Sequence, residues 1–349
     1  MNLLKSLKIF VKYMLVIWIL VFILSLALLV KSADWFVESS EKIGLALKIS
    51  PFIVGVTIVS IGTSFPELAS SVAAVLKGAS EIVTANVIGS NIANILLVIG
   101  LSAVAARSLF VKRSLIDLDA PLLAATTSLF IFIVWDRKIV FGEGILLLLA
   151  FAVYFLYTVF QRKEEVISPE LVEILPEGTK IKILPSRVER RREGIKEKPA
   201  KLNFKTFLFL ILGIVGLIIG ANYTIESVLK ISEILKISAG LIAITGVAVG
   251  TSLPELVVSV RAAIKKKYEI ALGNVFGSNV FNILIVAGVP ALIRPLAVDN
   301  LTFLIGLPFL VLATFLFVVS GISRRIYIWE GAMYILIYIL FIVKLLNLF

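Results

Sequence analysis

The sequence Gly62-Thr63-Ser64-Phe65-Pro66-Glu67 places two hydroxyls, a proline and a carboxylate inside a long apolar segment. The pattern returns 188 residues later as Gly250-Thr251-Ser252-Leu253-Pro254-Glu255. An ionisable side chain in an apolar segment of membrane length is costly, and it marks a functional site by default. The two copies therefore predict one site that both halves of the chain help to build.

The composition around these motifs is that of a membrane protein. The chain has 349 residues, of which 60% are hydrophobic and 16% are charged, whereas soluble domains are about 45–50% apolar and about 25% charged. Apolar stretches of about 20 residues, the length that crosses a bilayer, recur throughout. We predict an all-α polytopic membrane protein. Its ten predicted spans are 11–32, 50–76, 82–105, 117–135, 139–160, 204–225, 239–264, 270–293, 301–319 and 327–347.

The absence of two residue types narrows the chemistry. The chain has no cysteine and no histidine, which excludes thiolate sites, disulfides and the usual proton shuttle. We therefore expect neither an intramembrane hydrolase nor any other enzyme, and no cofactor. The net charge of +11 does not indicate nucleic-acid binding, because much of the basic excess flanks the spans and fills one central loop.

An internal repeat organises the ten spans. Residues 33–100 match residues 221–288 without a gap, and roughly half of the paired positions are identical. We predict a first five-helix repeat over 1–161, a polar linker over 162–203 and a second repeat over 204–349. Because five is odd, the second repeat must enter the membrane from the opposite side. This inverted topology is typical of secondary transporters, whose site lies at the midplane where the repeats meet.

The distribution of Lys and Arg predicts the orientation. The connections 1–2, 3–4, 5–6, 7–8 and 9–10 carry more basic residues than the opposite side. By the positive-inside rule the central loop is cytoplasmic and both termini are outside the cell membrane. We expect the protein to work in the bilayer as a monomer.

The paired motifs collect oxygen ligands. Proline clashes with the carbonyl four residues earlier, so each motif predicts a helix kink that frees carbonyls around Ser60 and Ala248. These oxygens join the hydroxyls of Thr63 and Ser64 and the carboxylate of Glu67. Hard cations such as Na⁺ and Ca²⁺ require an oxygen-only environment of this kind.

A second pair of segments adds polar groups. Asn86, Ser90 and Asn94 are spaced four residues apart, so they form one polar stripe on an apolar helix. The stripe recurs as Asn274, Ser278 and Asn282. It could contribute cation ligands, or it could hydrogen-bond a neighbouring helix, as polar stripes in membranes often do.

Charge balance favours cation binding. Glu67 and Glu255, brought face to face, need a counter-charge, and we expect that charge to come from outside the protein. The alternative is a pair of buried carboxyls that are satisfied or protonated at helix kinks. One Ca²⁺ or two monovalent cations would neutralise the pair.

The two motif pairs resemble the repeats of the cation/Ca²⁺ exchanger superfamily, and the chain is most similar to the prokaryotic sodium/calcium exchangers. The resemblance implies alternating access, in which the first and sixth spans slide across a rigid core. It implies Glu67 and Glu255 as principal Ca²⁺ ligands. It implies that the Na⁺ and Ca²⁺ sites are completed by side chains of Thr63, Ser64, Ser90, Asn94, Thr251, Ser252, Ser278 and Asn282, and by the carbonyls of Ser60 and Ala248. One departure is Asn282, where such exchangers usually have aspartate.

We therefore expect an antiporter that exchanges Na⁺ for Ca²⁺. The alternatives are a Ca²⁺/cation antiporter driven by H⁺ or K⁺ and, from a different class, a passive cation channel. The asparagine at position 282 leaves the coupling ion and its stoichiometry open.

Overall fold

The computed structural model describes residues 2–47, 49–76, 78–110, 120–160, 202–235 and 252–346. Within these ranges, eight helices are long and apolar enough to cross a membrane. A shorter apolar helix covers 120–136, and α12 is the described part of the one remaining predicted span. The predicted linker over 162–203 lies, except for its last two residues, outside the described residues.

The first repeat is almost entirely helical. Several of its spans are composite helices, in which an α-helix continues into a wider π-helical turn. Its elements are α1 (Asn2–Leu47), α2 (Pro51–Val54), η1 (Gly55–Val59), α3 (Ser60–Leu76), α4 (Ser80–Ile92), η2 (Ala93–Ile99), α5 (Gly100–Ala106), β1 (Ser108–Phe110), α6 (Ala120–Ile133), η4 (Val134–Asp136), β2 (Lys138–Ile139) and α7 (Phe141–Phe160).

The second repeat follows the same order of elements. Its described parts are α10 (Phe204–Ile234), α12 (Leu253–Ile264), α13 (Tyr268–Phe281), η6 (Asn282–Val286), α14 (Gly288–Ile293), β3 (Leu296–Ala297), η7 (Thr302–Gly306), α15 (Leu307–Ile322), β4 (Arg325–Tyr327) and α16 (Ile328–Leu345). Most boundaries lie within a few residues of the predicted spans.

The predicted end of the first span, at residue 32, is wrong. Helix α1 continues to Leu47 and carries the acidic residues Asp34, Glu38 and Glu41 beyond the apolar stretch. These side chains pair with Arg261 of α12 and with Lys265 and Lys267 in the turn between α12 and α13, so a polar helical extension is stabilised there. The corresponding helix α10 likewise runs past the predicted residue 225, to Ile234.

Two short strand pairs reveal the internal two-fold symmetry. Strand β1 pairs antiparallel with β4, and β2 pairs antiparallel with β3. The repeat maps β1 onto β3 and β2 onto β4, so each pair is the symmetry image of the other. Left-handed backbone also recurs at equivalent positions, since Gly78 matches Lys266 and Arg137 matches Arg324. The described chain is thus two inverted-topology repeats related by a pseudo-two-fold axis.

The strand pairs also sort the connections by side. The β1–β4 pair joins connections 3–4 and 9–10, and the ring of Phe110 lies 5.7 Å from that of Tyr268, which begins α13 after connection 7–8. The β2–β3 pair joins connections 4–5 and 8–9. This grouping agrees with the prediction that connections 3–4, 7–8 and 9–10 share one side.

The glycines at the repeat interface allow close backbone approach. A Cβ at Gly144 would lie 3.0 Å from the carbonyl oxygen of Gly288, and one at Gly331 would lie 2.7 Å from that of Gly100. These contacts seat α7 on α14 and α16 on α5, and the repeat relates one contact to the other. Small residues at helix interfaces are the usual packing device in membranes, where burial of apolar surface contributes little.

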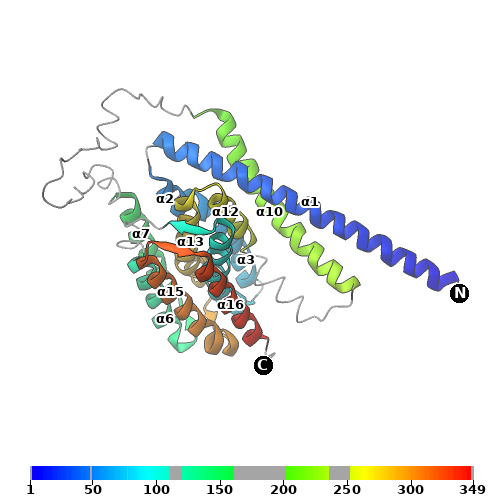
Figure 1. Ribbon diagram of the computed structural model, residues 1–349. Helices are drawn as coiled ribbons and strands as arrows, with labels where there is room; N and C mark the ends of the chain where they lie inside the picture. Colours follow the sequence, from blue (N-terminus) through cyan, green and yellow to red (C-terminus); the bar gives the residue numbers. More distant parts are fainter. Residues whose placement is uncertain are drawn as a thin grey trace, which may run out of the picture.

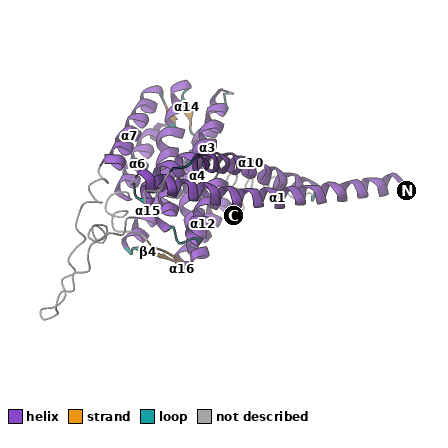
Figure 2. Ribbon diagram, turned by 90° about the horizontal axis from the view of Figure 1, so that it is seen from above, coloured by secondary structure: helices purple, strands orange, loops and turns teal. Residues whose placement is uncertain are grey.

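Helices α1 and α10 form a separate layer beside the other helices. They pack against each other, and both Figure 1 and Figure 2 show α1 projecting well beyond the remaining bundle. A row of glycines on α10 makes this possible, because Gly213 lies against Phe36, Gly216 against Ser32 and Gly220 against Leu29.

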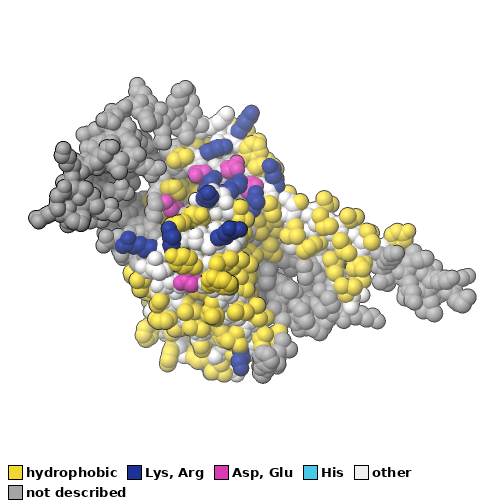
Figure 3. All heavy atoms as spheres, viewed as in Figure 1, with side chains coloured by type: hydrophobic (Ala, Val, Ile, Leu, Met, Phe, Trp, Pro, Cys, Tyr) yellow, Lys and Arg dark blue, Asp and Glu magenta, His cyan; other side chains and the backbone are white. Residues whose placement is uncertain are grey.

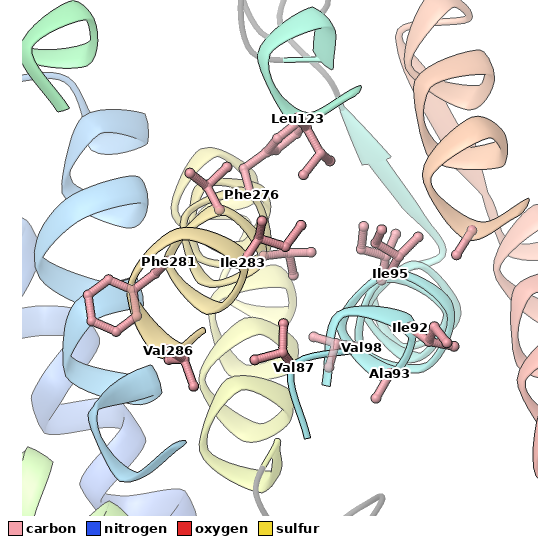
Figure 4. Close-up of a cluster of buried hydrophobic side chains, with 14 of the residues drawn as sticks. Val87, Ile92, Ala93, Ile95, Val98, Leu123, Phe276, Phe281, Ile283 and Val286 are labelled. Carbon is pink, nitrogen blue, oxygen red and sulfur yellow. The ribbon is translucent and has the colours of Figure 1, made fainter. Parts of the chain in front are cut away.

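The core of the bundle joins the two repeats. Figure 4 shows side chains from α4 and η2, among them Val87 and Ile95, beside Phe276 of α13 and Ile283 and Val286 of η6. All five are buried. The repeat relates α4 and η2 to α13 and η6, so this core forms around the pseudo-two-fold axis.

Candidate cation-binding site

Glu67 lies in the middle of α3, deep within the protein. Its exposed fraction is 1%, and neither of its carboxylate oxygens has a hydrogen-bond partner among the described residues. An uncompensated buried carboxylate is destabilising. Such an arrangement is typical of a site that a cation fills.

Glu255 occupies the equivalent position in the first turn of α12. It is completely buried, and its Oε1 accepts a hydrogen bond from the Ser64 hydroxyl at 2.9 Å. Its Oε2 has no partner in the described part of the chain. The Ser64–Glu255 bond brings the two sequence motifs into direct contact.

The hydroxyl of Thr63 extends this contact to α13. Thr63 Oγ1 lies 3.1 Å from Asn274 Oδ1 and 3.4 Å from Ser278 Oγ. It also lies 3.2 Å from the carbonyl oxygen of Ser60, to which it can donate. All of these groups are buried. The first motif therefore sits against the polar stripe of the second repeat.

The polar stripes divide into two parts with different roles. Asn86 donates to Ser71 Oγ at 3.3 Å, and its symmetry partner Asn274 donates to Ser259 Oγ at 2.9 Å. These two asparagines thus bond a neighbouring helix, which is the structural alternative that the sequence left open. Ser90 Oγ donates to Asn86 Oδ1 at 3.3 Å, within the stripe.

Asn94 and Asn282 differ from Asn86 and Asn274, the asparagines that begin the two stripes. Both are buried, and neither the amide oxygen nor the amide nitrogen of either side chain has a hydrogen-bond partner among the described residues. Asn94 lies in the π-helical η2 and Asn282 begins the π-helical η6. Such wide turns often occur at functional sites in helices. These two amides are therefore available to a ligand.

The proline does not interrupt the helix in the first repeat. Helix α3 continues through Pro66 from Ser60 to Leu76, and a wide π-helical turn precedes α3, in η1. The Ser60 carbonyl is within reach of the Thr63 hydroxyl, and the Ser60 hydroxyl donates to the Val56 carbonyl. In the second repeat α12 begins at Leu253, with Pro254 in its first turn, where a proline is tolerated.

Most of the predicted ligand residues are buried, and hydrogen-bond contacts join Thr63 to Ser60 and Ser278, and Ser64 to Glu255. The described ones are Ser60, Thr63, Ser64, Glu67, Ser90, Asn94, Ser252, Glu255, Ser278 and Asn282, and all are buried. Thr251 and Ala248 lie outside the described residues. Within the described ranges no three acidic, histidine or cysteine side chains cluster.

Two site residues were not predicted from the sequence. Ser71 and Ser259 receive the hydrogen bonds of Asn86 and Asn274, and thereby fix the orientation of those amides. They are identical in the two repeats and follow Glu67 and Glu255 by four residues, which places them on the same helix face. That periodicity was the signal that could have found them.

A row of ion pairs joins α1 to α12, and it was not predicted from the sequence. Arg261 binds Asp34 through two hydrogen bonds, Nε to Oδ1 at 2.9 Å and Nη2 to Oδ2 at 2.6 Å. Lys265 lies 2.9 Å from both Asp34 and Glu38. Figure 3 shows Lys, Arg, Asp and Glu side chains gathered in the upper part of that view, above a broad hydrophobic surface.

Comparison with known proteins places these features in a family. The model of the family described as sodium/calcium exchanger protein matches residues 17–160 and 205–346. The sodium/calcium exchanger MaX1 of Methanosarcina acetivorans is 34% identical, over 93% of this chain and 97% of its own length. The uncharacterized membrane protein MJ0091 of Methanocaldococcus jannaschii is 32% identical, over 95% of this chain and 99% of its own.

Solved structures show the same architecture. The sodium-calcium exchanger NCX_Mj, soaked with 2.5 mM Na⁺ and 0.1 mM Sr²⁺, superposes with a TM-score of 0.74 at 30% identity. The match covers 93% of this chain and 98% of that one. A structure of the same exchanger without Na⁺ and Ca²⁺ gives a TM-score of 0.71.

Proposed function

This chain belongs to the sodium/calcium exchanger protein family, and we propose that it is a secondary active antiporter that exchanges Na⁺ for Ca²⁺ by alternating access. The observation that carries this is the contact between the two repeats at Ser64 and Glu255. It assembles two buried carboxylates and a set of neutral oxygen donors into one region. A transported cation supplies the counter-charge that this region needs.

The donor set fits hard cations. Glu67 offers two open carboxylate oxygens and Glu255 offers one, and the amide oxygens of Asn94 and Asn282 are also open. Ca²⁺ takes 6–8 oxygen ligands, and hydroxyls and carbonyls can complete that number. We assign the remaining coordination to Thr63, Ser64, Ser90, Ser252 and Ser278, to the Ser60 carbonyl and, from the repeat, to Thr251 and the Ala248 carbonyl.

The layer of α1 and α10 is suited to gate this site. The ring of Phe36 on α1 packs directly against Gly62, where a Cβ atom would lie only 2.5 Å from the ring's Cζ. Phe36 also packs against Gly213 of α10. Phe36 therefore bridges the moving layer and the helix that carries Glu67. In alternating access, sliding of this layer would expose the glutamates to one side at a time.

The same proposal includes the placement of the protein in the cell membrane. We assign the face that carries β1 and β4 to the cytoplasm, because its connections are the more basic ones. The central linker would then be cytoplasmic and both termini external. We propose that one chain suffices for transport, since both halves of the site come from its own two repeats.

Flux measurements test the coupling ion. Liposomes that contain the purified protein are loaded with Na⁺, K⁺ or a buffer of different pH, and uptake of ⁴⁵Ca²⁺ is followed. Accumulation driven by an outward Na⁺ gradient alone is the expected result. Accumulation that does not depend on Na⁺ and follows the K⁺ or pH gradient would show that K⁺ or H⁺ is the coupling ion. Single-channel currents would show passive conduction and contradict exchange.

A further inference from the structure

The row of ion pairs between α1 and the end of α12, which we call the latch, joins the α1 layer to the rest of the bundle. It consists of Asp34 with Arg261 and Lys265, Glu38 with Lys265, and Glu41 with Lys267. The side chains of Asp34 and Arg261 are only 18% and 30% exposed. Water and salt therefore screen this pair less than they screen a pair on the open surface.

The latch lies on the side of the protein that carries β1 and β4. Lys267 directly precedes Tyr268, the first residue of α13, and the ring of Tyr268 lies 5.7 Å from that of Phe110 in β1. Arg261 follows Glu255 by six residues on α12. The latch thus connects the α1 layer, at one side of the protein, to the helix that carries a glutamate of the candidate site.

The repeat does not reproduce the latch on the opposite side. The equivalents of Asp34, Arg261, Glu41 and Lys267 are Asn222, Ala73, Leu229 and Ala79, and those of Glu38 and Lys265 are Glu226 and Lys77. Lys77 lies outside the described residues. Only the pair of Glu38 and Lys265 keeps both charges in its equivalents, so the bidentate arginine pair belongs to the β1–β4 side alone.

Movement of the α1 layer along α12 would break this arginine pair. A displacement of one helical turn is about 5.4 Å, whereas a bidentate pair of arginine and carboxylate holds only within a narrow geometry. We propose that the latch closes the β1–β4 side of the site and favours the state that opens to the opposite side. The proposal rests on the alternating access proposed above, and it adds an unequal population of the two states.

Loss of the pair between Asp34 and Arg261 should raise the population of the state that opens to the β1–β4 side. One charge-assisted hydrogen bond contributes roughly a factor of ten or more to an equilibrium constant. Two such bonds join these side chains. Arg261→Gln and Asp34→Asn should therefore each raise that population at least roughly tenfold, and two variants are used because either could fail to fold.

A single introduced cysteine can report this opening, because the chain contains none of its own. Ser40 lies on α1 beside the latch and is completely buried. It shares a helix face with Gly44, which packs against Val54 of α2, so Ser40→Cys places the thiol between α1 and the bundle. Ser323→Cys, exposed just before β4, measures the fraction of molecules whose β1–β4 side faces outward.

The experiment follows the labelling of Ser40→Cys in proteoliposomes by a charged maleimide that does not cross the bilayer. Arg261→Gln and Asp34→Asn should each accelerate labelling from the β1–β4 side roughly tenfold. The matched control is Lys230→Gln, which removes an ion pair with Glu233 that lies within α10 alone, and it should label at the parental rate. Equal labelling rates in the parent and both latch variants would overturn the latch.

The KM for Ca²⁺ at each face separates a latch from a general loosening of the bundle. It is measured in membrane vesicles of the two orientations. Loss of the latch should lower the KM at the β1–β4 face and leave it unchanged or higher at the opposite face, because apparent affinity depends on the fraction of molecules in the competent state. A KM that falls at both faces overturns the latch and leaves exchange standing. Absence of Na⁺-driven Ca²⁺ uptake by the parent overturns the proposed function itself.

Discussion

The replacement Gly277→Ala tests whether close packing of α13 on the second span holds the site together. A Cβ at this position would lie 2.4 Å from both the Val56 carbonyl oxygen and the Ser60 hydroxyl oxygen. This is 1.0 Å short of the 3.4 Å at which ordinary contact begins. Because Val56 contributes a backbone atom, no side-chain rotation relieves the clash, and the two helices must separate.

The consequences for stability and for the site can be estimated. Overpacking costs about 1–3 kcal/mol, while the better helix propensity of alanine returns up to about 1 kcal/mol. We expect a net loss of about 1–2 kcal/mol. A separation of roughly 1 Å also stretches the 3.1 Å contact between Thr63 Oγ1 and Asn274 Oδ1 beyond hydrogen-bonding distance, so Ca²⁺ binding should weaken as well.

Thermal unfolding in detergent, followed by tryptophan fluorescence, measures the first effect, and Ca²⁺ titration measures the second. The matched control is Gly142→Ala, since no atom of the described residues lies within 4 Å of a Cβ at Gly142. That variant should be unchanged or more stable. A melting temperature and a Ca²⁺ affinity for Gly277→Ala equal to those of the parent would refute the packing argument.

Three further predictions concern the α1 layer and the ninth span. A double-mutant cycle of Asp34→Asn and Arg261→Gln should give a coupling energy of about 1–2 kcal/mol in thermal unfolding, because two charge-assisted bonds join these half-buried groups; a coupling near zero would contradict it. Gly216→Leu should lower stability by about 1–3 kcal/mol, because a Cβ there would meet the side chain of Ser32; an unchanged melting temperature would argue against close contact of α1 and α10. Partial burial opposes ionisation of Asp299, but hydrogen bonds from the hydroxyl and N–H of Thr302 hold its pKa below the ordinary 3.8. Its stabilising effect is thus complete above pH 3.8 and disappears as the pH falls through the lowered pKa; the difference in melting temperature between the parent and Asp299→Ala should shrink in acid, and a constant difference would contradict the assignment.

The repeat explains why so much of the architecture could be predicted. Identical residues at fixed spacing, such as Glu67 and Glu255, required equivalent environments, and an odd number of spans in each half required inversion. The structure adds that the two motifs touch through Ser64 and Glu255.

The parts that could not be predicted depend on packing between helices. The stripe pattern treats Asn86 and Asn94 alike, yet only Asn86 meets Ser71 while Asn94 remains open. The proline pattern gave no indication of the wide π-helical turn in η1, which precedes the helix that contains Pro66. A one-dimensional pattern marks polar positions, and the neighbouring helix decides which of them is satisfied.

The ion pairs of α1 are a similar case. Asp34, Glu38 and Glu41 are spaced as one helical face, but their basic partners lie more than two hundred residues away. The repeat gave no help with Asp34, because its equivalent is Asn222 and that of Arg261 is Ala73. The row of ion pairs is therefore a feature in which the two repeats differ.

Direct Ca²⁺ binding to the two glutamates tests the central claim. Isothermal titration of the purified protein would compare the parent with Glu67→Gln, Glu255→Gln and the control Glu81→Gln, whose side chain is exposed at the start of α4. Each site variant should lose at least about thirtyfold in affinity, or about 2 kcal/mol, while the control binds like the parent. Parental affinity in either site variant, with the fold intact by thermal unfolding, would contradict the account.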